Sequence, residues 1–473
     1  MAFKKKLHAL RPDREPRHVE TQRTRTLRRM EPATPRRIER DVRQLLAEKV
    51  CGNLVGLWLL VPEHLRLGTW DLLCGWTGAD GNRVEPRMAL QLVHEAALCS
   101  HGIRQGRSLS QKGFELANGL PFIVSDRAVH DLLASRSIAQ SQRLQEALGR
   151  LRRASGHYRG RLLAVDPHRV RSYSRRQMRR RKSKRGGKAE KMAQTFFCVD
   201  LDTAQPLAFT TATAAQSVSQ ATPELLRMVE DILDPVAGDT LVLADLEHFS
   251  SALIDSVKEG SPFELMVPLP AREALRKRME AIPPEAFTPQ WAGYATAVVP
   301  YELRNSRSGP CCLFVQRSGE RIEEHRFKGF LCTAHRDVVE ALTTDYPKRW
   351  HIEEFFNTHQ AMGWDRAGTQ NLHIRYGQMS LALLAQGATH QLRQRLEVPV
   401  SDWTAQHLAD AILTGLDGDI RVRDDTVLVT YYNAPDAERL KKHYQGLPAR
   451  LEREGVKPNV PWLYDLKLDF RFC

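Results

Sequence analysis

The run Arg161-Leu-Leu-Ala-Val-Asp166 is a short apolar segment that ends in an acid, and Asp239-Thr-Leu-Val-Leu-Ala-Asp245 repeats this pattern further along the chain. Apolar runs of this length, bounded by polar residues, are typical of buried β-strands. Each strand would carry an aspartate at its carboxyl end, which is where the chemistry of α/β sheets gathers. We therefore expect Asp166 and Asp245 to lie close together.

The segments around these two runs predict the order of the remaining elements. Between the runs lie two strand-like segments (195–201 and 207–211) and a helix (223–233), and after them a helix to about 258 and a strand (263–268). The order is three strands, helix, strand, helix, strand. This is the order of the RNase H-like α/β fold, in which hairpins make the first pairings and helical crossovers bring in the later strands.

Composition divides the rest of the chain. The predicted regions are a basic flexible arm (1–40), an all-helical region (41–158), the first part of the core (159–264), a strand-rich insertion (265–340), the second part of the core (341–398) and a C-terminal region (399–473). Within the helical region, residues 109–121 and 125–133 are consistent with a helix-turn-helix-like element or with ordinary helix packing.

A third acid stands in the stretch Tyr346-Pro-Lys-Arg-Trp-His-Ile-Glu-Glu-Phe-Phe356. Tyr346, Arg349 and Glu353 are spaced i, i+3 and i+7, which puts them on one stripe of a helix. We expect Pro347 at the first helical position, with Tyr346 just outside the helix. A phenol, a guanidinium and a carboxylate side by side can bind a phosphate and a metal ion, although Arg349 and Glu353 could also form an ordinary surface ion pair.

Together, Asp166, Asp245 and Glu353 form a candidate catalytic and metal-binding triad. Three carboxylates cannot stay ionised together without a cation, and oxygen-only ligands favour Mg²⁺ or Mn²⁺, here as two ions. Other acids compete for each place: Asp200 and Asp202 for the first, Glu247 for the second and Asp345 for the third.

The net charge of +14 is concentrated in two segments. Residues 1–40 carry +8 and residues 171–191 carry +10, so the rest of the chain is slightly acidic. Concentrated positive charge predicts a polyanionic partner, although a basic tail can also be merely solvated. The basic residues of the second segment that are candidates to bind the backbone of such a polyanion are Arg175, Arg176, Arg179, Arg180, Arg181, Lys182, Lys184 and Arg185.

Other features exclude several classes of protein. The chain contains no run of eighteen apolar residues and no apolar leader after Met1, so we expect a soluble intracellular protein. Its eight cysteines include no CxxC pair, which predicts reduced thiols and makes a zinc site unexpected.

The triad, with Tyr346-x2-Arg349-x3-Glu353, resembles the DDE transposases of bacterial insertion sequences, in the branch with a Tyr-x2-Arg-x3-Glu-x6-Lys signature. The resemblance covers about residues 160–395. Gln360 stands where that signature has lysine, so a stripe position assigned to DNA carries no charge here.

The resemblance implies a two-metal polynucleotidyl transferase that cleaves double-stranded DNA at element ends and joins the ends to target DNA. It also implies a homodimer on DNA, a DNA-binding function for residues 41–158, and a cytoplasmic, nucleoid-associated location in a bacterium without any membrane partner. An RNase H-like endonuclease without strand transfer and a non-catalytic DNA-binding derivative are the alternatives. The C-terminal region would serve dimerisation or DNA contact.

Overall fold

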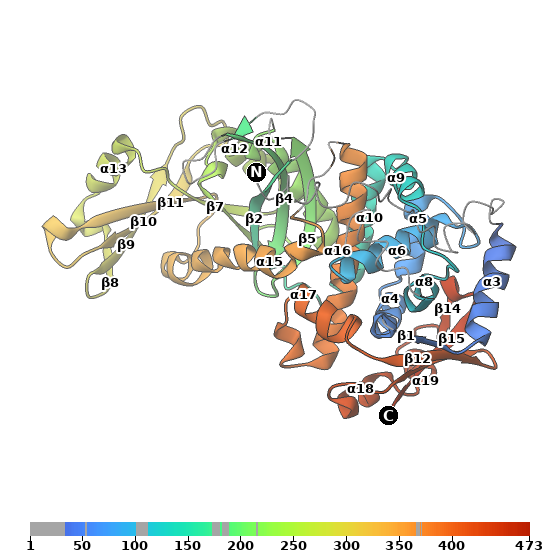
Figure 1. Cartoon of the computed structure of the whole chain (residues 1–473). Helices are drawn as coiled ribbons and strands as arrows, with labels where there is room; N and C mark the ends of the chain where they lie inside the picture. The colour runs from blue at the N-terminus through green and yellow to red at the C-terminus, as the bar shows by residue number, and fades with distance from the viewer. Residues whose placement is uncertain are drawn as a thin grey trace, which may run out of the picture.

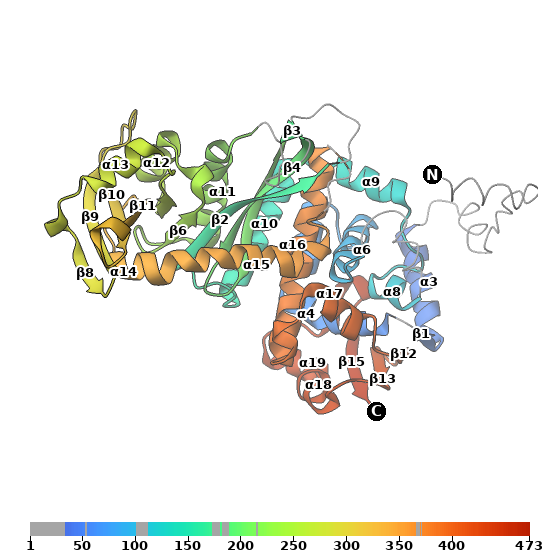
Figure 2. The same ribbon diagram turned by 60° about the vertical axis from the view of Figure 1, so that its left-hand side comes forward.

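The computed structural model describes residues 34–52, 54–100, 112–172, 180–181, 189–213, 216–365, 369 and 371–473. Two β-sheets organise these residues, and helices pack around both (Figures 1 and 2). No helix in the described ranges has the length and apolar character needed to span a bilayer.

The central sheet contains five core strands in the order β5-β4-β2-β6-β7. Their bounds are Leu162–Arg171 (β2), Glu190–Asp200 (β4), Gln205–Thr213 (β5), Leu241–Ala244 (β6) and Glu264–Pro268 (β7). β2, β4 and β5 pair antiparallel, whereas β6 and β7 join parallel to β2 after the helices α11 (Val218–Leu233) and α12 (Ser251–Gly260). The predicted α/β class, with antiparallel hairpin strands followed by helical crossovers, is confirmed.

The insertion continues this central sheet. Its elements are α13 (Glu273–Glu280), β8 (Thr288–Trp291), β9 (Tyr294–Tyr301), β10 (Cys311–Ser318) and β11 (Arg326–Cys332). β11 pairs antiparallel with β7, from Cys332 opposite Met266 to Phe330 opposite Pro268. Since β7 ends at Pro268, the first residues of β11 extend beyond the carboxyl end of β7.

Buried side chains alternate between the two faces of the central sheet, as the strand geometry requires. Leu163 and Val165 of β2 belong to the core that α11 and α12 cover. Leu162 and Ala164 belong to the core on the opposite face, which includes α15 (His351–His359) and α16 (Leu372–Leu396). Figure 2 shows α15 running across the strands on this second face.

The residues that the structure describes before β2 form mostly helices, together with the strand β1 (Val50–Gly52). The helices are α3 (Pro35–Ala47), α4 (Val61–Arg66), α5 (Thr69–Thr77), α6 (Glu85–Ala97), α8 (Lys112–Ala117), α9 (Asp126–Ala134) and α10 (Ile138–Ala154). The prediction of an all-helical region missed β1 (Val50–Gly52), because a strand this short has no periodic pattern. Helix α3 also crosses residue 40, where the basic arm was expected to end. The helix-turn-helix-like element remains a prediction, with α8 and α9 in its place.

The second sheet joins β1 to the strands of the C-terminal region. Its order is β1-β12-β13-β15-β14, with β12 (Gly418–Arg423), β13 (Thr426–Tyr431), β14 (Asn459–Val460) and β15 (Leu466–Phe472). α17 (Ala405–Leu408), α18 (Ala437–Tyr444) and α19 (Leu447–Arg453) belong to the same region. The apolar residues of this sheet share one core with the N-terminal helices and with α16.

The helix that carries Glu353 begins earlier than expected. The segment is helical from α14 (Val338–Glu340), where Asp337 caps the first turn, through a π-helical turn (Ala341–Asp345) and a 3₁₀ turn (Tyr346–Trp350) into α15. The prediction that Pro347 starts the helix is therefore wrong, and Tyr346 has helical angles (φ −61°, ψ −37°). We attribute this to the π and 3₁₀ turns, which change the hydrogen-bonding register where proline lacks an N–H.

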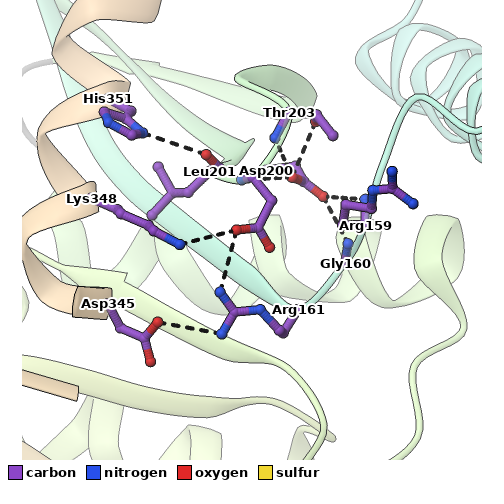
Figure 3. Close-up of polar contacts among 10 residues, drawn as sticks. Arg159, Gly160, Arg161, Asp200, Leu201, Thr203, Asp345, Lys348 and His351 are labelled. Carbon is purple, nitrogen blue, oxygen red and sulfur yellow. Dashed lines mark hydrogen bonds and ion pairs between the residues drawn. The ribbon is translucent and has the colours of Figure 1, made fainter. Parts of the chain in front are cut away.

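Asp200, the last residue of β4, connects two backbone segments at one end of the central sheet. Its carboxylate is fully buried and accepts hydrogen bonds from the backbone N–H groups of Arg159 and Gly160 (2.7 Å each) and of Asp202 and Thr203 (3.0 Å each) (Figure 3). These bonds tie the segment that enters β2 to the turn between β4 and β5. The contacts identify Asp200 as a structural residue.

Replacing Asp200 with alanine should lower the free energy of unfolding by roughly 3 kcal/mol, because several buried N–H groups lose their acceptor. Urea denaturation of the two proteins measures the difference. Asp200→Asn, which retains one acceptor oxygen, should cost less. Equal stability of the alanine variant and the native protein would contradict this role.

Candidate active site

Asp166 and Asp245 lie at adjacent positions on neighbouring parallel strands. The parallel register pairs Val165 with Ala244, so the two aspartates follow directly on each strand. Each stands two residues after a side chain of the α15 core, Ala164 or Leu243, and alternation places both on that face. The expectation that Asp166 ends its strand is wrong, because β2 continues to Arg171 along the longer partner β4.

Arg349 connects the helix to these strands. Its guanidinium lies 3.5 Å from Asp166 Oδ1 and 3.7 Å from Glu353 Oε1. The Tyr346 hydroxyl donates a hydrogen bond of 3.3 Å to the carbonyl of Ala244, the residue before Asp245. The predicted stripe of Tyr346, Arg349 and Glu353 thus lies beside the two aspartates. The Arg349–Glu353 ion pair extends to Asp166 and is not an isolated surface pair.

Aromatic packing holds the helix in this position. Ile352, Phe355 and Phe356 are buried, as the apolar arc of the helix predicted. His168, two residues after Asp166 on β2, stacks on Phe356 with ring centroids 4.4 Å apart. Burial lowers the pKa of His168 to about 4, so the ring is neutral near pH 7 and packs as an apolar surface.

The two aspartates differ in their electrostatic environment. Burial and the nearby charge of Asp245 raise the pKa of Asp166 to about 7, and Arg349 opposes this only in part. Burial also acts to raise the pKa of Asp245, but a 2.7 Å contact from His248 Nδ1 and the N–H of Glu247 outweigh it and lower that pKa. Asp245 is therefore the more readily ionised member of the pair.

The raised pKa of Asp166 predicts a pH-dependent stability. Between the ordinary pKa of 3.8 and the folded-state value of about 7, the folded protein binds more protons at this residue than the unfolded chain. Stability contributed by this group is therefore present at low pH and is lost as pH rises through this window. Urea denaturation across pH 4 to 7 should show the native protein losing stability relative to Asp166→Asn. A constant difference between the two would contradict the assignment.

His248 was not predicted as a site residue. It stands three residues after Asp245, on the 3₁₀ turn (Leu246–His248) that Asp245 caps, and its side chain is buried. The Asp-x-x-His spacing is the only signal in the sequence, and such spacing is common in turns. Its contact orients one oxygen of Asp245.

The competing acids have other partners. Glu247 is paired with the guanidinium of Arg169. Asp202 and Asp345 are both within 3.3 Å of the Arg161 guanidinium, and Asp202 also lies 3.5 Å from Lys348 (Figure 3 shows Arg161, Asp345 and Lys348). This second ionic group connects the residue before β2 to the π and 3₁₀ turns that lead into α15.

Several predicted DNA contacts lie apart from this site or outside the described residues. Arg180 and Arg181 form the short strand β3, which pairs with Lys191 and Glu190 of β4. Gln360 follows α15, and its carbonyl accepts hydrogen bonds from Gly363 and Trp364. The remaining basic candidates fall in segments that the structure does not describe: Arg175, Arg176, Arg179, Lys182, Lys184 and Arg185.

The acids at this site suit a hard divalent cation in type. Asp166 and Asp245 offer only oxygen donors, and burial together with the nearby charge of Asp245 raises the pKa of Asp166, an effect that a bound cation would oppose. In the described ranges, however, no three His, Cys, Asp or Glu side chains are grouped closely enough to hold a metal ion. The guanidinium of Arg349, not a third carboxylate, is the group in contact with Asp166.

The fold and this site define an α/β domain in which Asp166 and Asp245 occupy adjacent positions on neighbouring strands. Residues 157–386 match the family model described as a transposase DDE domain, and this range includes Asp166, Asp245 and Glu353. The match covers just under half of the chain.

Among solved structures, a piggyBac transposase in a synaptic complex with hairpin DNA is similar to this chain. The two share 11% sequence identity and a TM-score of 0.41, over 75% of this chain and 79% of that chain. None of the curated proteins matches the chain.

Proposed function

We propose that the protein is a DNA transposase that cleaves double-stranded DNA at the ends of a mobile element and joins the freed ends to target DNA. The observation that carries this proposal is the placement of Asp166 and Asp245 on adjacent strands, with Arg349 between Asp166 and Glu353. The match of residues 157–386 to a transposase DDE domain supports it.

The residues of the site divide into two kinds by their chemistry. Asp166, Asp245 and Glu353 are the acids that would hold two Mg²⁺ or Mn²⁺ ions. When bound, such ions stabilise the charge that develops on the attacking and leaving oxygens of a phosphodiester. Arg349 and Tyr346 would bind phosphate oxygens next to the reacting bond, since a guanidinium pairs with phosphate through two parallel hydrogen bonds.

The DNA would be bound mainly through its backbone. The chain carries a net charge of +14, and residues 171–191, from the end of β2 to the start of β4, carry a net charge of +10. Contacts of this kind fix the position of the duplex without reading its sequence. Because joining needs two element ends, we propose that the protein acts as a homodimer on DNA.

A strand-joining assay tests the proposal. The purified protein, with Mg²⁺, is incubated with a labelled duplex that ends in the inverted repeat flanking the gene, together with a target plasmid. Label covalently joined to the plasmid is the expected result, and a duplex with a scrambled end is the control. Cleavage without joining would instead favour an RNase H-like endonuclease. Binding without cleavage or joining would favour a non-catalytic derivative.

A further inference from the structure

Lys328 of the insertion lies at the edge of the sheet where the two aspartates are found. Phe330 pairs with Pro268, the last residue of β7, so Lys328 extends beyond the carboxyl end of that strand. Phe330 belongs to the core beneath α15, and alternation places Lys328, two residues earlier, on the same face of the sheet. Asp166 and Asp245 occupy that face and that edge.

Two aromatic rings hold the ammonium group there. Lys328 Nζ lies 4.9 Å from the ring centroid of Phe330 and 5.9 Å from that of Tyr346. The two rings meet edge to face with centroids 4.6 Å apart. The Tyr346 hydroxyl donates a hydrogen bond to the carbonyl of Ala244, the residue before Asp245. The ring of Tyr346 therefore connects Lys328 to the backbone beside one of the two acids.

Among the described residues Lys328 forms no ion pair with an acid, in contrast to Lys348 and Lys277. Lys348 lies 3.5 Å from Asp202, and Lys277 lies 3.0 Å from Glu273. Lys328 is exposed, and across the described residues its side chain makes no hydrogen bond or ion pair beside its contacts with the two aromatic rings. Contacts with the faces of aromatic rings leave the full positive charge of an ammonium available to an anion.

We propose that Lys328 binds a backbone phosphate of DNA next to the bond that reacts. This inference rests on the proposed function and extends it, because it assigns part of the strand-rich insertion to the DNA-binding surface of the active site. It also places a cation beside the acids from a second element, whereas Gln360 on the helix stripe carries no charge. Lys328 is a positioning residue that aligns the phosphodiester with Asp166 and Asp245.

The test compares Lys328→Gln and Lys328→Arg with Lys277→Gln, which removes the same charge from the same insertion at an ion-paired position. Affinity for a short duplex of mixed sequence is measured over a series of salt concentrations. Lys328→Gln should bind about fivefold more weakly at low salt, and the slope of log K against log salt should fall by about 0.9, as expected for one lost phosphate contact. Lys328→Arg should restore both values, and Lys277→Gln should leave both unchanged.

Strand joining at saturating DNA gives a second readout. A phosphate contact beside the reacting bond predicts a roughly tenfold lower rate for Lys328→Gln even when all the protein is bound. A native-like salt slope and joining rate in Lys328→Gln would overturn the proposal. Equal losses in Lys328→Gln and Lys277→Gln would also overturn it, because the charge would then act only at a distance. If the native protein binds DNA but joins none, the proposed function fails, while the binding measurements still decide whether Lys328 contacts phosphate.

Discussion

Asp245→Asn should reduce both DNA cleavage and strand joining by roughly a thousandfold or more, because the variant loses a charge that the proposed metal site requires. Asp245 is the stronger acid of the pair, and its orientation is fixed by His248 and by the N–H of Glu247. Asparagine has nearly the same volume, so the folded structure should persist. Asp166→Asn should cause a loss of the same order.

Glu247→Gln is the matched control for Asp245→Asn. It removes a carboxylate two residues away, which is paired with Arg169 instead of facing Asp166. Rates of cleavage and joining are measured at saturating DNA, and circular dichroism checks that each variant is folded. If Glu247→Gln were inactive and Asp245→Asn active, the two acids would have to exchange roles.

Arg349→Lys should lower the joining rate by about a hundredfold although the charge is kept, because an ammonium cannot reproduce the planar fork of a guanidinium. In the structure, Nη1 of the Arg349 guanidinium contacts Asp166, and Nη2 contacts Glu353. A lysine at this position can keep one contact but not the bridge between the strand and the helix. The binding of phosphate through two parallel hydrogen bonds is lost as well.

Arg169→Lys provides the comparison for Arg349→Lys. Arg169 is on β2, three residues after Asp166, and its partners are Glu247 and Gln194. We expect its joining rate to stay within a few-fold of the native rate, since its partners are not the proposed catalytic acids. A full joining rate in Arg349→Lys would show that the guanidinium serves only to neutralise charge.

The sequence was sufficient to predict the core strands and the neighbouring positions of Asp166 and Asp245. Apolar runs with polar ends predict buried strands without knowledge of their partners, and strand order then brings the two acids together. The start of the helix before Glu353 was not predictable by the rule used for Pro347, because a π-helical turn stabilised by tertiary packing overrides the local preference.

Contacts that depend on the register of strand pairing could not be predicted from the sequence either. The proximity of Lys328 to Tyr346 follows from the pairing of β11 with β7, which connects residues of the insertion to the core. Likewise, the partners of Glu247 and Asp202 are arginines on β2 or just before it, and only the folded chain shows which acids these arginines neutralise. Sequence spacing alone could not separate these acids from the candidate triad.

The pairing of β1 with β12 has a consequence for how the chain must fold. Val50 lies opposite Ile420, so a ribosome must synthesise most of the polypeptide before the N-terminal strand finds its neighbour. Contacts of such long sequence separation close slowly, and until then β1 presents an unpaired edge. The edge of β1 is therefore completed only after the segment that carries Asp166, Asp245 and Glu353 has been made.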